Sequence, residues 1–134
     1  MSVIDSSRLK PFSYPQQTLQ RAERALVCSP FNKSLFAAMR SRSVALGEIA
    51  MNTGVQKGYS KSPLSELAVD NFLVWLIQVG VLRREVDGQG ITDSFRLTPL
   101  GRQIVEQYQE KNWRTPTVRD RLLNAVNRWF RLPF

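Results

Sequence analysis

The stretch that decides the fold covers residues 64–108 and reads LSELAVDNFLVWLIQVGVLRREVDGQGITDSFRLTPLGRQIVEQY. In its first part, apolar residues recur every three or four positions from Leu64 to Val79, which is the spacing of a helix. Gly80 follows at once, and glycine commonly ends helices because it accepts the left-handed backbone of a C-terminal cap. The stretch therefore predicts a long helix over residues 64–79.

Two strands and a second helix are predicted after this glycine. Residues 81–86 and 91–97 read as strands, and residues 87–90 supply the glycines that a tight hairpin turn needs. Thr98 is a suitable N-cap, and Pro99 suits the first position of the next helix. A helix followed by a two-stranded ribbon is the layout of a winged helix, which usually works by binding and not by catalysis.

Three segments carry a resemblance to a known superfamily. They are LGEIA at residues 46–50, LIQVGVL at residues 76–82 and RLTPLGR at residues 96–102. In this order they resemble winged helix-turn-helix proteins, and the resemblance extends over residues 33–108. It implies a mostly α fold with a small β-ribbon, a winged helix domain with extra N-terminal and C-terminal helices.

The whole chain divides into three regions around this core. We expect a flexible N-terminal arm at residues 1–14, a winged helix domain with its leading helix at residues 15–112, and a C-terminal amphipathic helix at residues 113–134. Within the domain, helices are expected at residues 15–28, 33–42 and 44–52, followed by an exposed polar loop at residues 55–63. Gly54 is expected to close the third of these helices.

Charge and composition restrict the function. The chain of 134 residues has a net charge of +8, which favours a polyanionic partner. It contains no histidine and one cysteine, Cys28, which excludes an intramolecular disulfide, a histidine-assisted nucleophile and an imidazole zinc site. We therefore expect a protein that is not an enzyme and that uses no metal or cofactor. No apolar run is long enough to span a bilayer and no secretion signal is evident, so a cytoplasmic location is expected.

The resemblance implies binding to double-stranded DNA, by a transcriptional regulator or an architectural factor that we expect to be a homodimer. The helix over residues 64–79 would be the recognition helix, with Ser65, Val69 and Asn71 as base contacts. The expected phosphate contacts are basic or hydroxyl side chains of the helices, the loop and the wing: Arg40, Arg42, Lys57, Tyr59, Lys61, Arg83, Arg84 and Arg96. For the loop at residues 55–63, a solvated surface segment without any DNA contact is an equally favoured alternative.

A second hypothesis is a winged-helix module that binds proteins and not DNA. The expected recognition helix is apolar almost all round, which is typical of a core helix, and its Glu66 and Asp70 would repel phosphates. The C-terminal helix would then serve a homodimer or a protein partner, or pack on the protein's own Trp75 side, with an anionic membrane surface as the least favoured alternative. The residues expected at this interface are Leu73, Leu122, Val126, Trp129 and Phe130.

Overall fold

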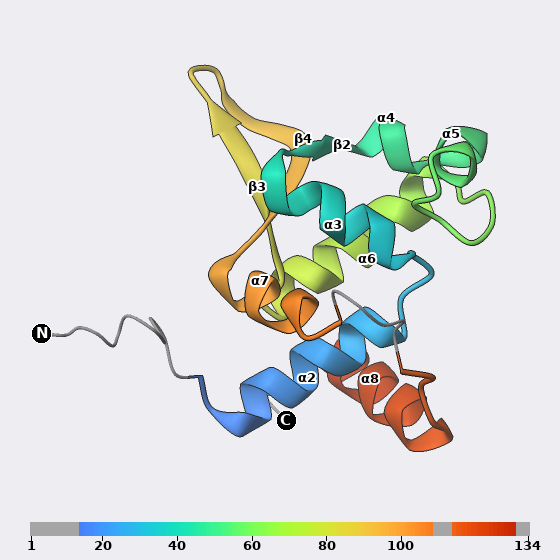
Figure 1. Ribbon diagram of the computed structural model, residues 1–134, viewed down its shortest axis with the longest axis vertical. Coiled ribbons are helices and arrows are strands. Elements are labelled where there is room, and N and C mark those ends of the chain that lie inside the picture. Colours follow the sequence, from blue (N-terminus) through green and yellow to red (C-terminus); the bar gives the residue numbers. More distant parts are fainter. Residues whose placement is uncertain (1–13, 109–113, 131–134) are drawn as a thin grey trace, which may run out of the picture.

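The computed structural model describes residues 14–108 and 114–130 (Figure 1). Over these residues the chain forms seven helices and one antiparallel sheet of three strands. The helices are α2 (Gln16–Val27), α3 (Lys33–Ser41), α4 (Leu46–Ile49), α5 (Met51–Gln56), α6 (Glu66–Gln78), α7 (Pro99–Glu106) and α8 (Val118–Phe130). The strands are β2 (Val44–Ala45), β3 (Leu82–Asp87) and β4 (Gly90–Leu97). The predicted class, mostly helical with a small β-ribbon, is confirmed.

The central helix α6, the β3–β4 hairpin and α7 follow the predicted order. Ser65 caps α6 by accepting a hydrogen bond from the Ala68 amide at 3.1 Å. Gly80 reverses the chain after the helix with a φ of 91°. Thr98 caps α7 by accepting a hydrogen bond from the Gly101 amide at 3.0 Å. Local residue chemistry thus sets both helix starts and the sharp turn between α6 and β3.

The three strands are ordered β2-β4-β3, so β4 lies in the centre of the sheet. On β4, the fully buried Phe95 pairs with Val44 of β2 on one side and with Arg84 of β3 on the other. A helix was expected to begin at residue 44, and this prediction is wrong. Two residues are too few to show a strand period, and the partner of β2 lies far along the chain.

Two short helices replace the single helix expected over residues 44–52. They meet at Ala50, whose backbone is extended, and Met51 follows with a φ of 59°. The second helix, α5, continues through Gly54, which was expected to end it. Glycine is needed at this position for space, because a Cβ would lie 1.8 Å from the carbonyl oxygen of Ile49.

The loop after α5 is tied to the fold at its centre. Phe31 and Ser60 form an isolated antiparallel bridge. Tyr59 and Ser60 are buried, whereas Lys57 and Lys61 are exposed. The prediction of an exposed polar loop is therefore correct at its edges and wrong at its centre, where the chain closes over the start of α3.

The hydrophobic core lies between α3, α6 and the sheet, with α2 and α7 closing one end (Figure 1). Phe31 meets Phe36 and Phe72 edge to face, with ring centroids 6.3 and 6.2 Å apart. The largest fully buried side chains are Phe31, Phe36, Phe95, Leu26, Leu35, Met39, Ile49, Leu73, Leu76, Leu82, Ile104 and Val44. These residues belong to α2, α3, α4, α6, α7, the strands and the segment before α3. Helix α6 is therefore covered on two sides, as the alternative of a core helix predicted.

The first and last described helices, α2 and α8, lie side by side (Figure 1). Arg24 of α2 donates a hydrogen bond to the buried Asn127 of α8 at 3.0 Å. Trp75 of α6 donates to Asn124 of α8 at 3.0 Å. One side of α8 thus packs on the protein's own Trp75 region, which was one of the alternatives for this helix. The expected arm at residues 1–14 lies outside the described residues except for Tyr14.

Candidate functional site

The expected phosphate contacts on the helices are held in ion pairs. Arg42 and Lys57 both reach Glu48, at 3.0 and 3.6 Å. Arg40 pairs with Glu106 of α7 at 3.2 Å. Each side chain is partly exposed and lies beside a carboxylate, which Arg42 and Lys57 share. A phosphate that approached these residues would have to displace that carboxylate or be repelled by it.

The arginines of the wing are paired in the same way. Arg84 of β3 lies 3.3 Å from Asp70 of α6, and its guanidinium stands over the Phe95 ring at 4.9 Å. Arg83 and Arg96 both approach Glu85, at 2.7 and 4.0 Å. These pairs brace the ribbon against α6 and along its own length. The wing therefore presents balanced charge, not an arginine cluster.

Of the loop residues expected to contact DNA, Lys61 is the best placed. It is exposed and makes no ion pair with any described residue. Tyr59 does not fit the expectation, because it is buried and its hydroxyl accepts a hydrogen bond from Arg42 at 3.1 Å. This ring fills the space under the loop, so the expected stacking or phosphate contact by Tyr59 is corrected.

The expected base-reading surface on α6 is also reduced. Val69 has no exposed surface and cannot touch a base, which corrects that assignment. Ser65 is exposed, but its hydroxyl already caps the helix. Asn71 is exposed and remains available for a base contact, with Asp70 as its neighbour in the chain. Asn71 alone could read a single adenine, and the neighbouring Asp70 carboxylate would repel phosphates at the same place.

Residues 42–97 hold α6, the wing and all but one of the expected phosphate contacts, and they carry no net charge. The six basic residues are Arg42, Lys57, Lys61, Arg83, Arg84 and Arg96. The six acidic residues are Glu48, Glu66, Asp70, Glu85, Asp87 and Asp93. Proteins gain most of their affinity for DNA by neutralising phosphates, so a balanced surface is a weak phosphate-binding surface.

The positive charge is concentrated at what we call the α2–α8 end: helix α2 together with residues 114–130. Its six arginines are Arg21, Arg24, Arg114, Arg119, Arg121 and Arg128. Its acidic residues are Glu23 and Asp120. This end of the molecule therefore carries four net positive charges, in contrast to the neutral wing segment.

The outer side of α8 carries an apolar stripe, made of Val118, Leu122, Ala125 and Trp129. Val118 is 84% exposed, Leu122 62% and Trp129 82%, and Ala125 is exposed as well. The four residues recur every three or four positions and so share one side of the helix. Isolated apolar residues on a surface are ordinary, but an aligned row with a tryptophan is typical of a binding surface.

The remaining residues of the expected interface have different positions. Val126 is half-buried at the side of the stripe. Leu73 has no exposed surface, because α6 is covered on both sides, so its assignment to an interface is corrected. The side chain of Phe130 lies outside those that the structure describes.

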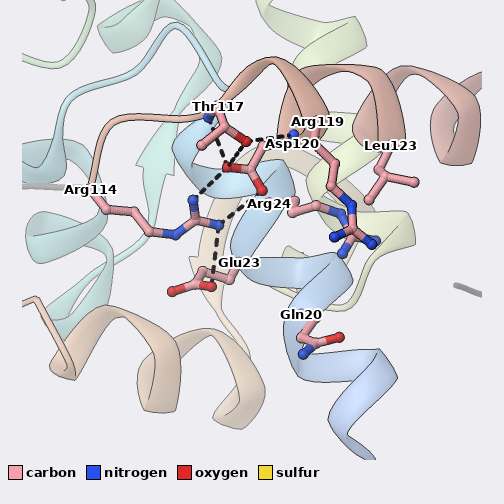
Figure 2. A pocket seen from close by; sticks show the side chains of 8 residues that line it. All are labelled: Gln20, Glu23, Arg24, Arg114, Thr117, Arg119, Asp120 and Leu123. Carbon is pink, nitrogen blue, oxygen red and sulfur yellow. Dashed lines mark hydrogen bonds and ion pairs between the residues drawn. The ribbon is translucent and has the colours of Figure 1, made fainter.

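The inner side of α8 and α2 enclose a charged pocket of about 410 Å³ (Figure 2). It is lined by Gln20, Glu23, Arg24, Arg114, Thr117, Arg119, Asp120 and Leu123. Arg114 binds both carboxylates, Asp120 at 2.6 Å and Glu23 at 3.4 Å. Asp120 also accepts a hydrogen bond from the Thr117 amide at 2.9 Å, while Thr117 accepts one from the Asp120 amide. The two residues form a reciprocal cap at the start of α8.

The environment of the pocket shifts its ionisable groups. The hydrogen bonds from Arg114, and then that from the Thr117 amide, hold the pKa of Asp120 well below its usual value. The bond to Asp120 likewise raises the pKa of Arg114. Burial lowers the pKa of Arg24; the charge of Asp120 opposes this shift, and the charges of Arg119 and Arg114 add to it.

The sequence did not predict this pocket. Arg24 and Arg114 lie in segments far apart in the chain, and no local motif joins them. The only available signal was the spacing of Thr117 and Asp120, which is that of a capping box and would have placed the start of the helix at Val118, inside the expected range 113–134.

Cys28 and the acidic residues are candidates for catalytic or metal-binding groups within the described part of the chain. Burial raises the pKa of the half-buried Cys28 thiol, which reduces its thiolate fraction at neutral pH. Within residues 14–108 and 114–130, no three Cys, Asp or Glu side chains gather as metal ligands. No helix in the same residues combines the length and the apolar character needed to cross a membrane.

A family model described as Npun_F0494-like matches residues 12–128, so the chain belongs to the Npun_F0494-like family. No curated protein and no solved structure shows a significant match to the chain.

Proposed function

We propose that this member of the Npun_F0494-like family is a winged-helix protein that works as a protein-interaction module and is not an enzyme. The order of α3, β2, α4, α5, α6 and the β3–β4 hairpin supports the winged-helix assignment, as does the sheet order β2-β4-β3. The absence of net charge over residues 42–97 speaks against the usual use of such a fold, in which α6 and the wing lie on DNA.

The observation that carries this proposal is the exposed apolar stripe on α8. Complete burial of a side chain such as Leu122 would contribute about 1.5–3 kcal/mol to binding before the costs of association. A buried Trp129 would add a large, rigid contact area at low entropic cost, and tryptophan is enriched among residues that dominate interfaces. DNA offers no comparable apolar surface, so the stripe would gain little from contact with a duplex.

The partner that fits this surface is a protein segment with apolar and acidic side chains. On the helix, Arg121 lies on one side of the stripe and Arg119 on the other. Arg128, on the same side as Arg121, holds its guanidinium over the Phe72 ring at 4.7 Å. The one acidic residue of α8, Asp120, is held by Arg114. Two copies of α8 would bring arginine against arginine, whereas an acidic amphipathic helix would be complementary on both sides.

The test uses two synthetic helical peptides labelled with fluorescein. One carries leucine on one side and glutamate on the other, and its control has lysine in place of glutamate. In anisotropy titrations, the glutamate peptide should bind the wild-type protein and the lysine peptide should not. Leu122→Gln and Trp129→Gln should each weaken binding at least tenfold, because truncating a central interface residue commonly has this effect. Leu67→Gln is the matched control, since Leu67 is 71% exposed but lies on α6.

Three outcomes would overturn the proposal. Equal peptide affinity for wild type and for Leu122→Gln would show that the stripe is not the contact surface. Self-association that depends on the stripe in sedimentation, without peptide binding, would establish a homodimer instead. Binding only to vesicles that contain anionic lipid would assign the helix to a membrane surface.

Sequence-dependent or architectural DNA binding is a second candidate, as in a small transcriptional regulator. The observation that favours it is the set of arginines at the α2–α8 end, among which Arg119 and Arg121 are exposed. Together with the net charge of +8, they would attract a duplex at low salt. The way in which the affinity for a DNA duplex changes with salt concentration separates this candidate from the first.

A further inference from the structure

The pocket between α2 and α8 has the chemistry of an anion-binding site. Figure 2 shows the guanidinium groups of Arg24 and Arg119 pointing into the same part of the pocket, one from each helix. Gln20 lies one helical turn before Arg24, on the same side of α2, and its amide is an additional neutral donor. Donors thus converge from two helices, with Arg24 also donating a hydrogen bond to Asn127 and Arg119 exposed at the surface.

The carboxylates of the pocket do not cancel this charge. Asp120 is engaged by Arg114 and by the Thr117 amide and hydroxyl. Glu23 accepts hydrogen bonds from Arg114 and from the Tyr108 hydroxyl. The three arginines therefore exceed the two acidic residues by one charge, and Arg119 makes no ion pair with any described residue. Two like charges held together in a recess are stabilised by an anion between them.

We propose that this pocket binds a phosphate-type oxyanion between Arg24 and Arg119. The planar guanidinium presents a fork of donors that matches two oxygens of a phosphate, and a dianionic phosphate complements two such groups. The pocket volume of about 410 Å³ exceeds what the ion alone requires, so a phosphate ester with a small organic group also fits. The site lies on the inner side of α8, whereas the apolar stripe lies on its outer side; Arg119 borders both, and Arg24 belongs to the pocket alone.

The test measures binding of inorganic phosphate by calorimetry, with sodium chloride at matched ionic strength as the reference. Wild type should bind phosphate, and Arg119→Gln should weaken binding about tenfold or more, because hydrogen bonds to charged groups are strong. Arg121→Gln is the matched control: it removes the same charge from the same helix but outside the pocket, and it should keep wild-type affinity. Arg24→Gln should weaken binding as Arg119→Gln does.

A second arm titrates adenosine monophosphate and glycerol 3-phosphate in place of the free ion. Tighter binding of either ester would identify a phosphorylated small molecule as the ligand, and equal or weaker binding would identify phosphate itself. The proposal would be overturned if phosphate gave no more binding heat than chloride at the same ionic strength. Equal weakening by Arg119→Gln and Arg121→Gln would also overturn it, because it would indicate only a general response to net charge.

Discussion

Among the seven glycines, Gly54 is the one whose surroundings leave the least space for a side chain. A Cβ at this position would lie 1.8 Å from the Ile49 carbonyl oxygen and 3.0 Å from the Ser60 hydroxyl. We expect Gly54→Ala to lower the free energy of unfolding by about 1–3 kcal/mol or more, since the backbone between α4 and α5 must shift. Urea denaturation measures the change.

The control for this prediction is Gly47→Ala on the neighbouring helix α4. Nothing lies within 4 Å of a Cβ built there, and the residue is exposed. Its free energy of unfolding should stay within about 0.5 kcal/mol of wild type. Equal destabilisation by the two substitutions would mean that the close approach at Gly54 is not what requires the glycine.

Single residues also show how far the sequence could be interpreted. The helical period correctly placed Leu76 in the core, but it assigned Val69 and Leu73 to the outer side of α6, where base contacts or a partner were expected. Both are buried, since α6 is packed against α2, α4 and β3. The spacing of apolar residues shows which residues share one side of a helix. It does not show how many sides the rest of the chain will cover.

At the scale of the element, the start of α8 depends on Asp120. Its folded-state pKa is lowered, first by Arg114 and then by the Thr117 amide, so its ionised form stabilises the folded state. This contribution is fully present above the ordinary pKa of an aspartate, about 3.9, and is lost as the pH falls towards the lower folded-state pKa. Asp120→Asn should lower the free energy of unfolding by about 1–2 kcal/mol at pH 7.

The pH dependence separates this effect from a general loss of packing. Below about pH 4, wild type should lose stability more steeply than Asp120→Asn, and the two curves should converge as the carboxyl is protonated. Denaturant titrations from pH 7 to pH 2.5 would show this. A constant difference between the two curves over the whole range would contradict the charge-based explanation.

Elements with local signals were predictable, and elements that depend on distant partners were not. The β3–β4 hairpin and the start of α7 follow from glycines and from the Thr98-Pro99 pair, which act within a few residues. Strand β2 exists because Val44 pairs with Phe95, and the loop at Tyr59 is buried because it meets Phe31. The pocket at the α2–α8 end was missed for the same reason, since its arginines come from opposite ends of the described chain.

For the whole molecule, the distribution of charge decides how DNA binding should respond to salt. If a duplex binds at all, its contacts should involve the α2–α8 end, since residues 42–97 are neutral. Arg119→Ala combined with Arg121→Ala should reduce the slope of log affinity against log salt by about 2. Arg83→Ala combined with Arg96→Ala should leave it unchanged, because both arginines lie beside Glu85 in a segment without net charge.

The wing variant also separates the two candidate functions. A flatter salt slope in Arg83→Ala with Arg96→Ala would show that the wing does contact phosphates, and DNA binding would then replace the protein-interaction proposal. No detectable affinity for a random duplex at 50 mM salt would remove the DNA candidate, because non-specific binding is strongest at low salt.

The pairing of α2 with α8 has a consequence for how the protein is made. Arg24 and its partner Asn127 are 103 residues apart. At the usual rates of translation, about 5–20 residues per second, α2 leaves the ribosome about 5–20 seconds before the helix that completes its surroundings. During this interval the middle of the chain can fold, while Arg24 of α2 still lacks its partner Asn127. Closure of the α2–α8 end can therefore take place only after the 103 residues that separate these partners have been made.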